Sequence, residues 1–247
     1  MQTIIQDLRY AIRTMVKRPG FTLVAALTLA LGIGANTAIF SAVNAVLLKP
    51  LPFPESEQLV DLAETFKPNG YGSVSVPNFE DWKKQNDVFT GIAAYQFRSF
   101  NLQSGDTPQR IPGISVSANY FEVLGAKPVL GRTFGNGEDL AGNDRVVVLG
   151  EDLWRRTFGG DTSIIGRTIP LNGQQYTVIG VMPPELSSLY RTVQLWSPLV
   201  FPEADRVNRN EHKYLVIGRI KSGVTLAQAR EQMTGIATRL EQQYKNG

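Results

Sequence analysis

The sequence predicts one transmembrane helix followed by an α+β domain that carries a β-rich insertion. Residues 21–48 contain no charged side chain, and about 20 helical residues are enough to cross a bilayer core of roughly 30 Å. Patterns of a strand followed by a helix stand near the start and at the end of residues 49–247. Short strands and turn signals fill the stretch between these patterns, which suggests that this stretch is inserted into the domain.

The composition excludes several classes of site. The 247 residues include no cysteine and one histidine, which excludes disulfide frameworks, cysteine zinc sites, thiol nucleophiles and histidine-pair metal sites. The formal net charge is +3, and residues 1–20 account for the whole excess, because the charges of the remaining chain balance. We therefore expect no nucleic-acid partner, which would require a basic face on the folded body.

Residues 1–19 are predicted to form an amphipathic helix on the cytoplasmic membrane surface. Apolar side chains share one helical face, namely Ile4, Leu8, Ala11, Ile12 and Met15. The membrane-interface and topology residues are Arg9, Arg13, Lys17 and Arg18. These cations would face anionic lipid head groups and keep this end of the span in the cytoplasm. A short solvated helix that only carries topology charges is the alternative. Pro19-Gly20 then bends the chain into the bilayer.

Residues 20–48 are predicted to form the transmembrane helix. The main competitor is a secretory signal peptide, whose apolar region spans about 7–15 residues and ends at a cleavage site of small residues. The run in this chain is about twice as long and continues to Leu48. Small residues recur every four positions and would let another helix approach closely, unless they reflect only an alanine-rich composition. This strip consists of Ala26, Ala30, Gly34, Ala38 and Ala42.

The basic flank places residues 49–247 outside the cytoplasm, which in a bacterium with two membranes is the periplasm. The chain leaves the span through a proline-rich segment, residues 49–54, that favours an extended conformation. We next expect strands over residues 58–65, 91–102 and 110–117 and a helix over residues 77–85. Ser117 is expected to cap a short helix that runs through Val123.

The second half of this region repeats the alternation of strands and helices. A strand is expected over residues 145–150 and a helix over residues 152–158. A hairpin with strands over 167–171 and 174–181 is predicted around Asn172-Gly173, a strong signal for a two-residue turn. The last unit is a strand over residues 213–220 and a helix over residues 226–243 that begins with a capping box of Thr225 and Gln228.

The sequence predicts no catalytic, cofactor-binding or metal-binding residue. It contains no nucleophile elbow, phosphate-binding loop or zinc-protease motif. His212 lies in a polar run and is expected to be a solvated loop residue, on which any secreted-hydrolase alternative would depend. The carboxylate pairs Glu138-Asp139 and Glu151-Asp152 are expected in turns or helix starts. Core packing is expected for the three tryptophans, Trp82, Trp154 and Trp196.

Several stretches along the chain resemble one protein family. They are residues 7–11 (DLRYA), 18–22 (RPGFT), 27–41, 146–150 (VVVLG), 154–156 (WRR), 165–169 (IGRTI) and 178–183 (VIGVMP). With these stretches the chain resembles the N-terminal part of an ABC-transporter permease of the MacB/FtsX type, in its duplicated orphan permease (ADOP) branch. The likeness extends over essentially the whole sequence.

The resemblance implies a porter-like subdomain, residues 49–115 and 206–247, split by a sabre-like subdomain, residues 116–205. It implies a non-catalytic module of the bacterial inner membrane that couples the ATP-driven motion of a cytoplasmic ABC ATPase to export or mechanotransmission. The implied partners are membrane lipid, a second copy or a paired permease half, and the ATPase; a periplasmic adaptor is compatible with them, and no cofactor is implied. The alternative is a single-span, tethered periplasmic binding or scaffold module that needs no ATPase.

The family continues into three further spans that are absent from these 247 residues. A piece of a longer permease and a natural half-protein therefore both stay open.

Overall fold

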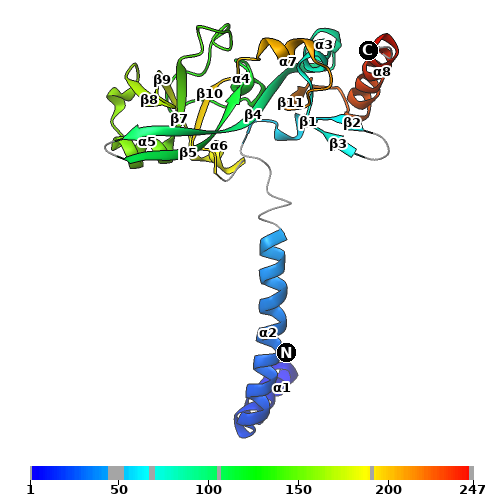
Figure 1. The fold of residues 1–247 in the computed structure, drawn as a ribbon. Coiled ribbons are helices and arrows are strands. Elements are labelled where there is room, and N and C mark those ends of the chain that lie inside the picture. The colour runs from blue at the N-terminus through cyan, green and yellow to red at the C-terminus, as the bar shows by residue number, and fades with distance from the viewer. Residues whose placement is uncertain (1, 44–52, 67–69, 105–106, 190–191, 245–247) are drawn as a thin grey trace. The chain divides into compact units, whose positions relative to one another are not determined.

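The computed structural model describes residues 2–43, 53–66, 70–104, 107–189 and 192–244. The chain divides into two compact units, Met1–Pro50 and Leu51–Gly247. Figure 1 shows the helices of the first unit and the mixed α+β structure of the second. We describe each unit by itself.

The first unit consists of helices α1 (Gln2–Lys17) and α2 (Pro19–Val43). Residues 19–41 of α2 are long and apolar enough to cross a membrane. Pro19 occupies the first position of α2, where the missing N–H has no helical partner in any case. The predicted amphipathic helix is confirmed as a helix, and residues 44–48 of the predicted span lie outside the described residues.

The second unit is built from eleven strands and six α-helices within the described ranges. The strands are β1 (Leu59–Leu62), β2 (Glu64–Phe66), β3 (Gly70–Gly72), β4 (Phe89–Ser104), β5 (Thr107–Val116), β6 (Leu130–Gly131), β7 (Val146–Gly150), β8 (Thr168–Leu171), β9 (Gln174–Met182), β10 (Leu195–Pro198) and β11 (Leu215–Ile220). The helices are α3 (Val76–Gln85), α4 (Tyr120–Leu124), α5 (Glu151–Phe158), α6 (Pro184–Leu189), α7 (Glu203–Val207) and α8 (Leu226–Tyr244).

The main sheet has the strand order β1-β11-β4-β5-β10-β7-β9-β6. The β5–β10 and β7–β9 pairs are parallel, and the other pairs in this order are antiparallel. Strand β8 pairs with β9 and also, through Leu171 opposite Leu102, with β4. Six strands, β4-β5-β10-β7-β9-β8, therefore close into a ring. Strands β2 and β3 form a separate small sheet.

The ring is fastened at the turn between β8 and β9. The Asn172 N–H donates to the carbonyl of Asn101 at 2.9 Å, and the Asn101 N–H donates to Oδ1 of Asn172 at 2.8 Å. Asn172 and Gly173 have φ angles of 53° and 77°, as a two-residue hairpin turn of this kind requires. The predicted Asn-Gly hairpin is thus confirmed, and its first residue also closes the ring.

The interior of the ring is a hydrophobic cluster to which alternate residues of its strands contribute. The buried members are Phe100, Leu102, Ile111, Val147, Leu149, Leu153, Trp154, Ile164, Ile169, Leu171, Val178, Val181 and Leu195. Side chains two positions apart point to the same face of a strand, which explains the alternation within β4, β7 and β8.

Two further clusters lie on opposite faces of the three strands β1, β11 and β4. Ile92 and Val216 belong to the cluster that includes buried residues of α3 and α8. The neighbouring residues Ala93 and Ile217 belong to the cluster that includes α4. Helices α3 and α8 therefore cover one face of these strands and α4 the other. All three tryptophans are buried, as predicted.

The β4–β5 hairpin contributes to both parts of the domain. Figure 1 shows it running from the neighbourhood of β11 to the neighbourhood of α5. Its proximal residues pack with α3, α4 and α8, whereas its distal residues Phe100, Leu102 and Ile111 pack inside the ring. The division at residues 115/116 and 205/206 into porter-like and sabre-like subdomains stays a prediction.

Two local predictions differ from the structure. The strand expected over residues 58–65 is divided into β1 and β2, because β2 pairs with β3 and not with the main sheet. Ser117 does not cap α4, which Asn119 precedes. The Ser117 hydroxyl instead accepts the N–H of Ala94 at 3.1 Å and donates to Oδ1 of Asn119 at 2.9 Å. The capping box of Thr225 and Gln228 is confirmed by reciprocal hydrogen bonds.

Candidate functional site

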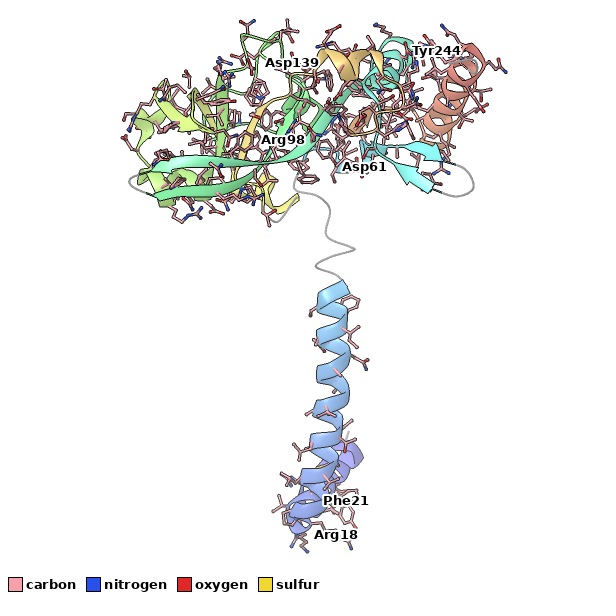
Figure 2. The ribbon with its side chains drawn as sticks, in the orientation of Figure 1. Arg18, Phe21, Asp61, Arg98, Asp139 and Tyr244 are labelled. Carbon is pink, nitrogen blue, oxygen red and sulfur yellow. The ribbon has the colours of Figure 1, made fainter. Side chains whose placement is uncertain are left out.

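The elbow between α1 and α2 is closed by one hydroxyl group. Oγ1 of Thr22 lies 2.8 Å from the carbonyl oxygen of Met15 and 3.1 Å from that of Arg18. The last carbonyls of a helix have no partner within it, and leaving them unpaired in an apolar medium is costly. The Thr22 hydroxyl, together with the Arg18 N–H that donates to the Met15 carbonyl at 3.3 Å, satisfies the end of α1 at the point where α2 begins. Figure 2 shows Arg18 and Phe21 at this elbow.

The four predicted topology residues lie in or next to α1. Arg9, Arg13, Lys17 and Arg18 are all exposed in the unit to which they belong. Lys17 stands in the last turn of α1, where a cation interacts favourably with the helix dipole. The side chains of Ile4, Leu8, Ala11 and Ile12 are outside the described residues, so the apolar face of this helix stays a prediction apart from Met15.

The predicted strip of small residues lies on α2. Ala26, Ala30, Gly34 and Ala38 are exposed, and the side chain of Ala42 is outside the described residues. A Cβ atom built at Gly34 would meet no atom within 4 Å. The helix therefore has room for larger residues on this strip within its own unit, and a role in helix packing stays a prediction.

A polar junction connects α7 to the residues that precede β11, close to the predicted boundary between the subdomains. Asp205 is 6% exposed, and its carboxylate accepts a hydrogen bond of 2.5 Å from the hydroxyl of buried Tyr214. Nζ of Lys213 donates to the same carboxylate at 3.2 Å. The bond from Tyr214 is the main reason why the pKa of Asp205 lies below its ordinary value. Burial, followed by the Asp205 hydrogen bond, raises the pKa of Tyr214 above its ordinary value.

Arg209, in the loop between α7 and β11, contacts two helices. Its guanidinium donates to Oδ2 of Asp81 at 2.6 Å and to Oδ1 of Asn78 at 2.5 Å, both on α3. The same group lies over the ring of Tyr244 near the end of α8, 3.6 Å from the ring centroid. A planar guanidinium suits this combination of a paired carboxylate and an aromatic face, which a lysine does not reproduce.

His212 is paired and partly buried, so the prediction of a solvated histidine is wrong. Its Nε2 lies 2.9 Å from Oε2 of Glu64, and 25% of its side chain is exposed. The other oxygen of Glu64 accepts the N–H and the hydroxyl of Ser75, at 2.8 and 3.3 Å. His212 does lie in a loop, as predicted. The loop is not solvated at this residue, because Glu64 of β2 contacts His212 with one carboxylate oxygen and Ser75 with the other.

This group of Ser75, Glu64 and His212 does not have the arrangement of a serine-hydrolase triad. In a triad the histidine stands between the serine and the acid and accepts the proton of the hydroxyl. Here the carboxylate occupies the middle position and the serine donates to it. Ser75 is also fully buried, so a substrate cannot reach its hydroxyl. The three side chains fasten β2 to the segments around residues 75 and 212.

The other predicted subdomain boundary, near residue 115, is also held by polar contacts. The buried hydroxyls of Ser115 and Ser197 lie 2.9 Å apart and connect β5 to β10. The Ala118 N–H donates to Oδ2 of Asp139 at 2.9 Å. Asn119 donates from Nδ2 to the carbonyl of Ile92 at 2.9 Å. Both places where the chain passes between the predicted subdomains are therefore pinned by side-chain hydrogen bonds.

The carboxylate pairs lie where the sequence predicts them. Glu138 and Asp139 are in a turn, and Glu138 forms a two-bond ion pair with Arg132, at 2.7 and 2.9 Å. The hydrogen bond from Arg132 lowers the pKa of Glu138. Glu151 begins α5 and pairs with Arg155. Across the described ranges, no group of three histidine, aspartate or glutamate residues is placed to hold a metal ion.

The site residues that the sequence did not predict share one property. Asp205, Arg209 and Tyr214 have partners on other elements, and no local motif marks such pairs. The dense run of polar residues from 203 to 213 was the available signal, because a segment of this composition that precedes a buried strand must pair its charges. At Asp205, Arg209 and Tyr214 the structure provides hydrogen bonds and ion pairs that hold elements together, and none of the three side chains is an exposed nucleophile.

Comparison of the sequence with known families decides the identity. The profile described as the MacB-like periplasmic core domain matches residues 22–236. The chain belongs to this family. The predicted resemblance to MacB/FtsX-type permeases is thereby confirmed at the level of the family, while assignment to the ADOP branch stays a prediction. Comparison with curated proteins gives no match.

Solved structures share the fold of this MacB-like domain. The periplasmic region of MacB from Actinobacillus actinomycetemcomitans matches with a TM-score of 0.56 and 17% identity, over 74% of this chain and 84% of that one. The extracellular domain of the noncanonical ABC-type transporter YknZ from Gram-positive bacteria gives a TM-score of 0.54 and 16% identity, over 76% and 96% of the two chains.

A domain of a permease protein from Porphyromonas gingivalis gives a TM-score of 0.58 and 15% identity, over 76% and 86% of the two chains. At these identities the likeness shows the fold. The predicted α+β class is confirmed, and the apolar helix α2 together with the MacB-like domain fits a membrane-anchored protein.

Proposed function

We propose that this chain is the membrane-anchored periplasmic core module of an ABC transporter permease of the bacterial inner membrane. In this proposal α1 lies on the cytoplasmic surface, α2 crosses the bilayer, and the MacB-like domain lies in the periplasm. The module couples motion driven by a partner ABC ATPase to export or to mechanical work and does not itself hydrolyse ATP. The observation that carries the proposal is the order of basic helix, apolar helix and MacB-like domain along one chain.

The polar junctions support a mechanical role over a catalytic one. Work can be passed through a protein only where its parts are held together, and both crossings near residues 115 and 205 carry buried hydrogen bonds. The charged contacts of Arg209 connect the same region to α3 and α8. We infer that the porter-like and sabre-like parts move together as one lever.

A topology experiment tests the placement of the domain. A reporter enzyme that is active only in the periplasm is fused after Gly247, and membranes are extracted with alkaline carbonate. We expect an active reporter that stays in the membrane fraction. Release into the soluble fraction, or an inactive reporter on a fusion protein that is present at full length, would contradict the proposal.

The strip on α2 gives a matched test for a second copy or a paired permease half. Gly34 lies on the strip and Gly32 on the opposite side of the helix, and a Cβ atom at either position would have no neighbouring atom within 4 Å. We expect Gly34→Leu to weaken association in detergent by at least tenfold and Gly32→Leu to leave it unchanged. Equal behaviour of the two variants would show that the strip is not an interface.

A pull-down tests the ATPase partner. The full chain is purified from membranes of its own bacterium in a mild detergent, and ATP hydrolysis in the eluate is measured. We expect ATPase activity that co-purifies with the wild-type chain and falls when an excess of untagged chain competes. An eluate without ATPase activity would favour the tethered scaffold that needs no ATPase.

A further inference from the structure

The chain enters the second unit through Phe53, Pro54 and Glu55, and these residues are held by more than their covalent connection. Phe53 is 9% exposed and belongs to the hydrophobic cluster that contains Tyr120 and Phe121 of α4. Pro54 and Glu55 are exposed, but their backbone carbonyls are not free. The entry segment therefore has one apolar anchor and two polar attachment points.

Both attachment points lead to Arg219 on β11. Nη1 of Arg219 donates to the carbonyl oxygen of Pro54 at 3.0 Å and to that of Glu55 at 3.2 Å. Nε of the same guanidinium donates to the carbonyl oxygen of Val123 at 2.7 Å. One side chain thus joins the entry segment, β11 and the end of α4.

The identity of the side chain suits this task. Val123 lies in the last turn of α4, whose final carbonyls have no helical partner and carry partial negative charge. A guanidinium has five N–H donors in a rigid fork, so it can serve three carbonyls on two separate segments. A lysine ammonium has three donors on one atom and cannot span the same distance. Gly125 lies close to the fork, since a Cβ atom there would be 3.4 Å from Nη2.

The backbone of the entry segment is held in an unusual conformation. Glu55 has a φ angle of 50°, in the left-handed region that residues other than glycine rarely adopt. Such a conformation persists where the surroundings fix it. The carbonyl of Glu55 accepts both Arg219 and the N–H of Gln58, the latter at 2.9 Å. The bend that leads into β1 is therefore held from two sides.

We propose that Arg219 is a positioning residue that clamps the entry segment onto β11 and α4. A displacement that reaches Phe53 along the chain is then delivered to β11, which is paired on both sides, by β1 and β4, and to the helix that packs against it. Without the clamp it would reach the sheet only through the apolar packing of Phe53 and through β1, an edge strand with one neighbour. The mechanical consequence rests on the proposed function, whereas the clamp itself is a property of the second unit.

Hydrogen exchange on the full chain in lipid nanodiscs tests the clamp. We expect Arg219→Met to speed exchange in the peptide that covers residues 53–58 by at least tenfold, and Arg219→Lys to fall between this variant and the wild type. Exchange in α8 should stay unchanged. The matched control is Arg132→Met, which removes an arginine whose side chain pairs with Glu138.

A pair of spin labels provides a second readout, because the chain has no cysteine of its own. Labels at Lys49→Cys and Glu231→Cys report on the chain before the clamp relative to α8, and labels at Asp152→Cys and Glu231→Cys report within the domain. Arg219→Met should widen the first distance distribution at least twofold and leave the second unchanged.

Three results would overturn the proposal. Exchange at residues 53–58 that does not change in Arg219→Met would show that the guanidinium does not hold the segment. Equal acceleration in α8, or widening of both label pairs, would show that Arg219 stabilises the whole domain and does not position its entry. None of these measurements involves an ATPase. They can therefore refute the clamp while the pull-down supports the ATPase partner, and the pull-down can refute that partner while they support the clamp.

Discussion

Removal of one hydroxyl group from the polar junction gives a sharp test of its energetic role. Tyr214→Phe deletes the donor that lies 2.5 Å from the buried carboxylate of Asp205 and leaves the ring in place. A hydrogen bond to a charged group contributes about 1.5–3 kcal/mol to stability. Asp205 keeps the bond from Lys213 at 3.2 Å, so the carboxylate is not left without a partner. We therefore expect a loss of about 2 kcal/mol.

The assay is urea unfolding of the full chain in detergent, followed by tryptophan fluorescence, because Trp82, Trp154 and Trp196 are all buried. In a domain of this size about 2 kcal/mol corresponds to a fall in Tm of roughly 4–8 °C. Tyr176→Phe makes the same chemical change at an exposed hydrogen bond to Arg145, and we expect it to cost less than about 0.5 kcal/mol. A Tyr214→Phe variant as stable as this control would refute the reasoning.

The same assay checks three other features of the fold. The difference in unfolding free energy between the wild type and Tyr214→Phe should shrink as the pH rises above about 10. The pKa of Tyr214 is raised in the folded state, so the unfolded chain loses its phenolic proton first, at about pH 10. A difference that stays constant up to about pH 11 would count against this explanation. Leu102→Ala inside the ring should cost about 3 kcal/mol, and Leu140→Ala, at an exposed position, less than about 0.5 kcal/mol; similar costs would mean that the ring has no packed core. Thr225→Ala removes the cap of α8 and should cost about 1 kcal/mol, whereas Thr238→Ala within the helix should be neutral or stabilising, and the opposite order would show that the capping box does not matter.

Local signals in the sequence predict much of this fold. Asn172-Gly173 marks its turn because both residues tolerate positive φ angles, and Thr225 with Gln228 marks the start of α8 because their side chains satisfy the first free N–H groups. The uncharged run of α2 is visible from composition alone. In each of these cases the residues that determine the structure are neighbours in the chain.

Features that depend on distant residues could not be predicted in the same way. Closure of the ring requires Leu171 to lie opposite Leu102, and nothing near either residue indicates the other. Ser117 has the composition of a helix cap, but the N–H of Ala94, which lies on β4, takes its hydroxyl instead. The pairing of His212 with Glu64 was missed for the same reason, since its partner lies on β2.

The residues of the candidate site also differ in whether neighbouring or distant parts of the chain determine their role. The topology role of Arg9, Arg13, Lys17 and Arg18 could be predicted because charge next to an apolar run has a local meaning, and it stays a prediction. The contacts of Arg209 and Arg219 join elements that are far apart in the sequence, and an arginine on a strand or in a loop has many alternative roles. Only the folded chain shows which carbonyls and carboxylates each guanidinium meets.

The strand order also determines when this domain can become complete during synthesis. Strand β11 begins at Leu215, yet it lies between β1 and β4, which end at Leu62 and Ser104. Strand β4 can pair early with β5, but β1 and the other edge of β4 cannot pair with β11 until residue 220 has left the ribosome. Their unpaired backbone and the apolar residues beneath α8 stay open throughout that interval, so a truncation before residue 220 should yield a product prone to aggregation and proteolysis, not a smaller stable domain.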